Sequence, residues 1–361
     1  MVKVLVVDDS AYMRYVLRKG LDEHPDVTVV DTARDGLEAL EKIASLRPDV
    51  VTMDLEMPRM DGFEALKRIM AGSPVPVIIL SSLTQEGADA TVRALRLGAV
   101  DFVPKPIGGA LDFQSVREDL VSKIKQVAGL HSSKLGLPRT VPTIERSKPE
   151  PDGRSRESRG LVIIGTSTGG PRALHEVVPH LPASLPAGVL IVQHMPPGFT
   201  RSLAQRLDEI SALRVKEAED GDTVQPGLAL LAPGNYHMTV SQGGHISLNQ
   251  NPSQHGVRPA VDVTMESAAR AYGAATIGVI MTGMGTDGTR GATLIKQAGG
   301  QVIVEDESTC VIYGMPRSAV EAKVVDKITP LDRIAAEVAS LVNARRPGTR
   351  AVHAVTGAGN S

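Results

Sequence analysis

Short apolar runs and longer amphipathic stretches follow each other in turn along most of this chain, and few folds are compatible with that order. Apolar runs this short are typical of buried β-strands, and the stretches between them have the spacing of helices. Repeated βα units predict an α/β fold, in which a doubly wound parallel sheet has helices on both faces. The first five runs are VKVLVV at 2–7, VTVVDTA at 27–33, DVVTMD at 49–54, VPVIILSS at 75–82 and AVDFVPKP at 99–106.

A polar segment divides the chain. From 131 to 159, Pro, Ser and Arg replace the periodic apolar residues, so this stretch cannot bury a face. Apolar runs resume with LVIIGTS, VLIVQHM, ATIGVIMTG and QVIVED, and the 361 residues fit two domains. We predict two doubly wound parallel-sheet domains at 1–128 and 160–345, a flexible linker at 129–159 and a disordered tail at 346–361.

Three shorter runs interrupt the second domain. LALLAPG, YHMTVSQ and GHISLNQ alternate apolar with polar residues and are separated by turns that contain Gly. Alternation with tight turns is typical of antiparallel strands. We therefore predict a local antiparallel hairpin within the second domain.

Charge and composition exclude several kinds of partner. Lys and Arg number 39 against 41 Asp and Glu, so no general positive field would hold nucleic acid. Aromatic residues make up 2% of the chain, too few for the stacking sites of single strands and sugars. The chain starts without a signal-peptide pattern, contains no apolar stretch of membrane-spanning length, and has a single cysteine, Cys310. We expect a cytoplasmic protein without membrane insertion and without a nucleic-acid partner.

Polar side chains follow the apolar runs of the first domain. Asp8 and Asp9 come after the first run, Asp54 ends the third, Ser81 lies at the end of the fourth and Lys105 follows the fifth. The carboxyl ends of parallel strands meet at one edge of a sheet, so these groups should lie together. Clustered carboxylates suit Mg²⁺, and a carboxylate beside that cation could attack a phosphoryl donor. Lys105 would pair with the phosphoryl oxygens, and Ser81 would hydrogen-bond to them in the product.

Each of these acids alone is explained as well by helix capping or a turn, but their joint arrangement is not. The segment DLEMPRMDG at 54–62 and the spacing of all five elements up to about residue 125 resemble the receiver domain of two-component response regulators. The resemblance implies a flavodoxin-like domain that a histidine kinase phosphorylates on Asp54. It also implies that Asp9, Asp54 and the backbone carbonyl of Glu56 hold Mg²⁺ with the help of Asp8, and that Phe102 occupies the aromatic switch position.

A second site is predicted after the first strand of the second domain. Residues 165–169 read Gly-Thr-Ser-Thr-Gly, a G-x-S-x-G sequence between an apolar run and a helical stretch. Such a turn exposes the hydroxyl of Ser167 at the sheet edge, next to a helix N-terminus that can hold an oxyanion. His194 closes the next apolar run and could be the base, and Asp287 follows a third run and could orient the imidazole. We predict that the three form a hydrolytic triad.

Other interpretations of these residues are weaker. GTSTGG matches neither of the common phosphate-binding glycine patterns. Taken singly, His194 could be an ordinary strand-end histidine, and Asp287 could be a helix N-cap. The order Ser, His, Asp also differs from the order in α/β-hydrolases, so that superfamily is excluded.

The segments GTSTGG, QHMP, LAPGNYHM, RPAVD and TGMGTDG resemble the catalytic domain of chemotaxis protein-glutamate methylesterases over about residues 160–345. The resemblance implies a three-layer α/β/α domain in which Ser167, His194 and Asp287 form the triad and the backbone N–H of Met284 contributes to the oxyanion hole. It implies hydrolysis of glutamate γ-methyl esters on methyl-accepting chemoreceptors, with release of methanol, and deamidation of selected receptor glutamines. The reaction would pass through an acyl-enzyme and need no cofactor. His237, Arg258 and Asp262 also match family motifs, and either site shaping or simple packing explains them.

The two-domain layout predicts regulation. A linker of about thirty residues permits two docked arrangements, so the unphosphorylated receiver is expected to cover the Ser167 pocket until Asp54 is phosphorylated. A DNA-binding regulator is a poorer alternative because the second half lacks a compact helix-turn-helix pattern. A dinucleotide-dependent oxidoreductase is also a poorer alternative, because the second domain lacks the glycine spacing of dinucleotide-binding loops. Motifs alone do not separate an enzyme from an inactive adaptor.

Overall fold

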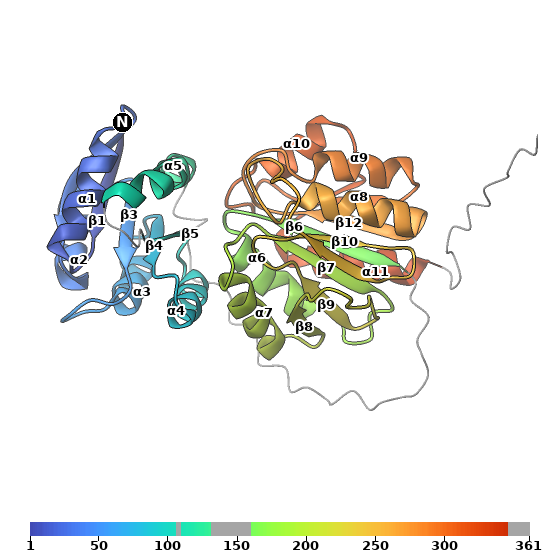
Figure 1. Cartoon of the computed structure of the whole chain (residues 1–361). Helices are drawn as coiled ribbons and strands as arrows, with labels where there is room; N and C mark the ends of the chain where they lie inside the picture. The colour runs from blue at the N-terminus through green and yellow to red at the C-terminus, as the bar shows by residue number, and fades with distance from the viewer. Residues whose placement is uncertain (106–109, 131–159, 346–361) are drawn as a thin grey trace, which may run out of the picture.

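The computed structural model describes residues 1–105, 110–130 and 160–345 (Figure 1). The predicted tail, and the predicted linker from residue 131 onward, lie outside these residues, so the domain boundaries stay predictions. The described residues form two parallel sheets and one small antiparallel pair, which confirms the predicted fold class. None of the described helices combines the length and the apolar character that crossing a lipid bilayer requires.

The first sheet has the strand order β2-β1-β3-β4-β5, which is the order of flavodoxin-like folds. Every residue of β3 and β4 is buried, because central parallel strands have helices over both faces. Each strand lies within one of the predicted apolar runs. The elements are β1 (Val2–Val7), α1 (Ala11–Asp22), β2 (Val27–Ala33), α2 (Gly36–Leu46), β3 (Val50–Asp54), α3 (Gly62–Gly72), β4 (Val77–Ser81), α4 (Gln85–Arg96), β5 (Asp101–Pro104) and α5 (Ala110–Val127).

The second sheet is parallel throughout, in the order β14-β13-β12-β6-β7-β9-β8. Helices α8, α9 and α10 cover one face and α6, α7 and α11 the other, so that Leu161 and Ile163 of β6 pack in one apolar cluster while Val162 and Ile164 pack in another (Figure 1). The strands of this sheet are β6 (Leu161–Thr166), β7 (Gly188–Gln193), β8 (Arg214–Glu217), β9 (Leu228–Leu231), β12 (Thr276–Ile280), β13 (Gln301–Glu305) and β14 (Lys327–Thr329). The helices are α6 (Gly170–Val177), α7 (Phe199–Ile210), α8 (Val261–Tyr272), α9 (Thr289–Gln297), α10 (Met315–Glu321) and α11 (Leu331–Ala344).

The predicted antiparallel hairpin is present but smaller than expected. It consists of β10 (His237–Val240) and β11 (Ile246–Asn249). The run at 228–234 was wrongly assigned to it: this run forms β9, which pairs in parallel with both β7 and β8. Ala229, Leu230 and Leu231 are all buried, so the strand lies inside the main sheet. A parallel strand is buried on both faces, so alternation of apolar and polar residues does not identify its partner or its direction.

Helix α1 begins at a serine, and the acids before it serve another purpose. The hydroxyl of Ser10 accepts the N–H of Met13 at 3.3 Å, which makes Ser10 the N-cap. The alternative that Asp8 or Asp9 caps this helix is therefore wrong. Asp8 instead accepts the N–H of Ser10 at 2.9 Å, which orients its carboxylate at the end of β1.

The two sheet domains meet through the α4, β5 and α5 side of the first (Figure 1). Helix α4 packs against α7 and α6, and Gln85 donates to the hydroxyl of Ser202 at 2.9 Å. The ring of Phe102 stacks on Phe199 of α7 with ring centres 4.4 Å apart. One apolar cluster runs through this contact from the first core to the second.

Candidate active site

Ser167 lies in the turn between β6 and α6 and is half-buried. Its N–H donates to the carbonyl of Thr282 at 3.0 Å, and its carbonyl accepts the N–H of Gly170 at 2.8 Å, so the turn is held between the end of β12 and the start of α6. A side chain at Gly283 would bring a Cβ within 2.7 Å of the Ser167 Cβ. The close approach of these two strand ends therefore requires glycine at that position.

His194 and Asp287 are brought together as predicted. His194 directly follows β7, and its Nε2 lies 2.8 Å from Oδ2 of Asp287. Burial acts to raise the pKa of Asp287, but the hydrogen bond and charge of His194, with the N–H groups of Asp262 and Val261, hold it below its ordinary value. An ionised Asp287 accepts a hydrogen bond from the Nε2–H group, which leaves Nδ1 of the imidazole as the basic nitrogen.

Ser167 and His194 line one pocket of about 260 Å³. Among the described residues, no hydrogen bond joins the Ser167 hydroxyl to the imidazole. Met284 follows Gly283 in the loop after β12, and among the described residues its N–H donates to no protein group, so it is available to an oxyanion. The geometry brings together a hydroxyl, an imidazole with an orienting carboxylate, and a backbone N–H that could serve as nucleophile, base and oxyanion donor.

Gln193, which the sequence analysis missed, ties the nucleophile turn to the base. Its amide nitrogen donates to the carbonyls of Ser167 at 3.0 Å and His194 at 3.2 Å, and its amide oxygen accepts the hydroxyl proton of Thr166 at 2.6 Å. The side chain is buried, and the amide nitrogen makes two hydrogen bonds while the oxygen accepts one. Its place next to His194 at the end of an apolar run was the only sequence signal for it.

The first domain forms one wall of this pocket, which sequence reasoning expected in outline but not by residue. Lys123 connects α5 to β5: its Nζ lies 3.1 Å from Asp119 of α5, and 3.6 Å from Asp101 and 2.7 Å from the Phe102 carbonyl of β5. The lining residues from the first domain are Asp101, Phe102, Pro104, Asp119 and Lys123, and those from the second are Ser167, His194, Met195, Pro196, Val257 and Arg258. A bulky substrate would therefore meet the first domain before it met Ser167.

The three motif residues left open by the sequence differ in their roles. Arg258 lines the pocket, with its guanidinium held by the Gln250 carbonyl at 2.8 Å and the Asn235 side chain at 2.6 Å. His237 is buried, and both of its ring nitrogens meet backbone groups, which is a packing role. Asp262 is buried next to Asp287.

The acids of the first domain also lie together. Nζ of Lys105 is 2.6 Å from Asp54 and 3.0 Å from Asp8. Burial and the nearby Asp54 charge raise the pKa of Asp8, although Lys105 opposes the shift. Burial would lower the pKa of Lys105, but the two carboxylates outweigh it and raise the value.

A divalent cation fits this acidic site. Ligand oxygens of Asp8, Asp9 and Asp54 lie within 4.8 Å of one another. The Oδ2 atom of Asp8 is buried, and among the described residues its close partner is the Lys105 ammonium at 3.0 Å. A buried carboxylate oxygen beside two other carboxylates suits a hard cation such as Mg²⁺.

The other predicted receiver residues are placed differently. Glu56 is exposed, and its N–H reaches Asp54 only at 3.4 Å. The hydroxyl of Ser81 is occupied at the start of α4, where it lies 3.0 Å from the Gly87 carbonyl and 2.5 Å from the Thr91 hydroxyl. Ser81 would have to leave these partners to reach a phosphoryl group on Asp54.

Two family models match separate parts of the chain. A family model described as CheB methylesterase matches residues 162–338, and one described as response regulator receiver domain matches residues 4–114. A protein-glutamate methylesterase/protein-glutamine glutaminase of Symbiobacterium thermophilum is 53% identical over 344 residues, which cover 92% of this chain and 95% of the relative. Its counterpart in Pyrococcus abyssi is 47% identical over 363 residues, covering 99% and 96%. The crystal structure of the Thermotoga maritima CheB methylesterase catalytic domain, 49% identical, covers 50% of this chain and 98% of that chain with a TM-score of 0.49.

Proposed function

Because the chain belongs to the CheB methylesterase family and carries a receiver domain, we propose that it demethylates glutamate γ-methyl esters on methyl-accepting chemoreceptors. The chain is a hydrolase of the protein-glutamate methylesterase and protein-glutamine glutaminase type. Its substrates would be methyl esters and selected glutamines on the cytoplasmic helices of receptors, which makes the cytoplasm its place of action. The observation that carries this proposal is that His194, which is hydrogen-bonded to Asp287, lines one pocket with Ser167.

The proposed chemistry uses the triad twice. Nδ1 of His194 removes the Ser167 hydroxyl proton while Oγ attacks the γ-carbonyl carbon, and the oxyanion accepts the N–H of Met284. The imidazolium, stabilised by Asp287, then returns the proton to the leaving group, which departs as methanol from an ester or as ammonia from a glutamine. Water activated by the same imidazole cleaves the acyl-enzyme and leaves a glutamate.

The receiver would control access to this chemistry. Asp54 is proposed as the phosphorylation site for a chemotaxis histidine kinase, with Lys105 paired to the transferred group. Mg²⁺ held by Asp8, Asp9, Asp54 and the Glu56 carbonyl would offset the charge of that group. The docked receiver walls the pocket with Phe102 and Lys123, and this supports the proposal that phosphorylation loosens the contact and exposes Ser167.

The decisive experiment measures methanol release from methylated receptor membranes. Wild type should release methanol faster when a phosphodonor and Mg²⁺ are added, Ser167→Ala should release none above background, and Asp54→Asn should lose the response to the donor. Unchanged release by Ser167→Ala would place the chemistry elsewhere and refute the triad.

A second experiment tests the covering role of the receiver. A chain that begins at Gly160 should release methanol faster than the unphosphorylated full chain, because the wall formed by the first domain is gone. If the shortened chain were folded by circular dichroism but no faster, direct occlusion would be wrong.

A further inference from the structure

Two buried carboxylates lie side by side behind the catalytic imidazole and cap each other's helices. Asp287, in the loop before α9, accepts the N–H groups of Val261 at 2.7 Å and Asp262 at 2.8 Å, which are the first two residues of α8. Asp262 in turn accepts the N–H groups of Gly288 at 3.0 Å and Gly291 at 2.7 Å, at the start of α9. The N–H of Gly288 also reaches Asp287 at 2.9 Å, so the two carboxylates share a donor. Movement of one carboxylate therefore disturbs the other.

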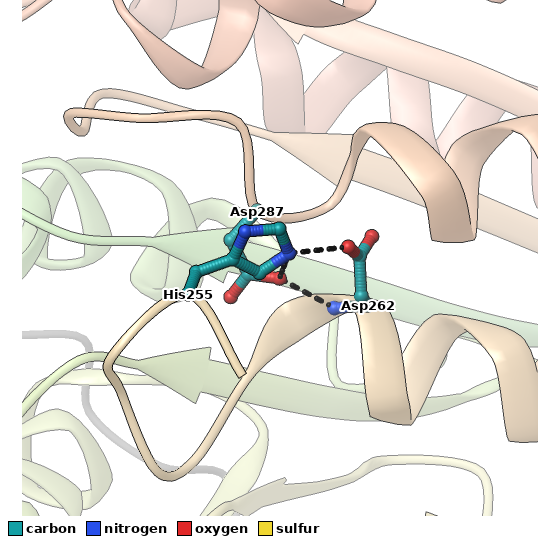
Figure 2. A group of neighbouring side chains, drawn as sticks. All are labelled: His255, Asp262 and Asp287. Carbon is teal, nitrogen blue, oxygen red and sulfur yellow. Dashed lines mark hydrogen bonds and ion pairs between the residues drawn. The ribbon is translucent and has the colours of Figure 1, made fainter. Parts of the chain in front are cut away.

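His255 lies against this pair of carboxylates. Its Nε2 is 2.8 Å from Oδ2 of Asp262 and 3.8 Å from Oδ1 of Asp287, and the imidazole points from its loop toward both (Figure 2). Gln254 and Val257 exchange backbone hydrogen bonds around a tight turn, in which φ is 53° at His255 and 77° at Gly256. Two central residues with positive φ are the pattern of a type I′ turn, and histidine is among the residues that tolerate this conformation. The turn thus presents an uncommon backbone that aims His255 at the carboxylates.

The same three side chains could be considered as cation ligands, since their ligand atoms lie within 4.8 Å of one another. Their surroundings are wrong for a cation. Four backbone N–H groups from two helix N-termini are directed at the carboxylates, and the Arg290 guanidinium lies 3.9 Å from Asp262. Positive helix ends and a guanidinium stabilise negative charge and oppose a metal ion. The cluster is built to hold two carboxylates with protein donors.

We propose that His255 is a positioning residue for ester hydrolysis, which acts through Asp262 on the orientation of Asp287. The proposal rests on the function proposed above. Oδ2 of Asp287 accepts hydrogen bonds from both His194 Nε2–H and the Val261 N–H, so a small rotation of this carboxylate changes the direction in which it holds the imidazole. The hydrogen bond from His255 fixes Asp262, and the shared Gly288 donor carries that constraint to Asp287.

Two substitutions of His255 in the full chain separate its hydrogen bond from its packing. Asparagine tolerates positive φ, but its amide is too short to reach Asp262, whereas the glutamine amide nitrogen reaches the position of Nε2. With methylated receptor membranes, a small-molecule phosphodonor and Mg²⁺, His255→Asn should lower kcat about tenfold with KM unchanged, and His255→Gln should restore kcat to within about threefold of wild type. The NMR resonance of the proton between His194 and Asp287 should shift in His255→Asn and return in His255→Gln. His245→Gln, an exposed histidine on the hairpin of the same domain, is the control and should change neither.

Several outcomes would overturn this role. A wild-type kcat with an unshifted proton in His255→Asn would do so, as would equal losses in both variants. A melting temperature that Zn²⁺ raises in wild type but not in His255→Asn would make the cluster a cation site instead. Ser167→Ala in the same assay separates the two proposals: its inactivity beside a fully active His255→Asn would refute only the role of His255, and its activity would refute both.

Discussion

At the scale of single residues, the proposed triad depends on neighbours that have no part in the proposed reaction. Gln193 holds the backbone of Ser167 and of His194 from one buried amide, and no other side chain among the described residues hydrogen-bonds to both. A buried donor of this kind is costly to lose, because the carbonyls of Ser167 and His194 would each lose a hydrogen bond, although that of Ser167 keeps the N–H of Gly170. The relative position of nucleophile and base is therefore set in part by Gln193.

Gln193→Glu is the sharpest test of this role. A carboxylate has the same shape but no N–H, so it would face the two carbonyls with a negative charge. We expect kcat for methanol release to fall by more than about tenfold while KM stays near its wild-type value. Gln242→Glu, an exposed residue, is the matched control. Equal kcat in the two variants would show that Gln193 positions nothing.

His175 on α6 gives a prediction for pH. Burial, assisted by the charges of Arg206 and Arg96, lowers its pKa to about 4, against the opposing hydrogen bond to the Pro171 carbonyl. The unfolded chain binds this proton near pH 6.5 and the folded chain does not, so stability is complete above pH 6.5 and is lost as the pH falls toward 4. The loss should be on the order of 3 kcal/mol.

Urea unfolding of wild type and His175→Asn at pH 7.5 and pH 5 measures this effect. Asparagine can keep the hydrogen bond to Pro171 made by Nδ1, but it does not titrate. The free energy of unfolding should therefore fall less in the variant than in wild type between the two pH values. Parallel falls would assign the pH dependence to other groups.

Strand-end reasoning predicted the three residues that are proposed to react, since Ser167, His194 and Asp287 each follow an apolar run. It could not find His255. That side chain arrives through a turn with positive φ, and no run or motif predicts where such a turn points. Ser81 lay at the expected strand end, but its partners on α4 depend on tertiary packing.

At the scale of elements, the active site depends on the close approach of the loops that follow two neighbouring parallel strands, β6 and β12. The turn after β6 rests on the loop after β12, with Gly283 against Ser167. The apolar runs predicted these strands, whereas the edge strand β8 was missed because its sequence, RVKE, is mostly charged. Edge position relaxes the need for apolar residues, so pattern alone does not reveal such strands.

Gly283→Ala should separate the two strand ends. The added Cβ would lie 2.4 Å from Sδ of Met315 and 2.7 Å from Cβ of Ser167, so the loop must move. We expect a loss of about 1–3 kcal/mol in the free energy of unfolding, as for other overpacked sites, and a larger proportional loss of kcat. Gly72→Ala, where a Cβ would meet no atom within 4 Å, is the control. A wild-type kcat in Gly283→Ala would contradict the importance of this contact.

At the scale of the whole molecule, the receiver is docked with its β5 and α5 side over the hydrolytic pocket. The sequence predicted two domains and a covering role, but the face used by each domain comes from contacts between residues more than a hundred positions apart, such as Gln85 and Ser202. The stacking of Phe102 on Phe199 could not be predicted either, because two uncharged rings carry no complementary charges that would pair them in the sequence.

Ser202→Arg should weaken the docked arrangement. Ser202 is buried on α7 against α4, and a long cation there would force the helices apart. The unphosphorylated full chain should then release methanol several-fold faster, with a smaller gain on adding the phosphodonor. Gln205→Arg makes the same change on the exposed side of α7 and should leave the basal rate alone. Equal basal rates in the two variants would contradict occlusion through this contact.

Asp287 caps α8 and Asp262 caps α9, so the same pair of carboxylates contributes to the stability of the fold and to the proposed catalysis. Replacing Asp287 removes an acceptor from the first residues of α8 as well as a partner from His194. In a cell, such a variant would hydrolyse its substrate more slowly and would also be degraded by proteases, so selection acts against substitution of Asp287 for two separate reasons. A designer who wants an inert but intact chain should alter the serine and leave the aspartate alone.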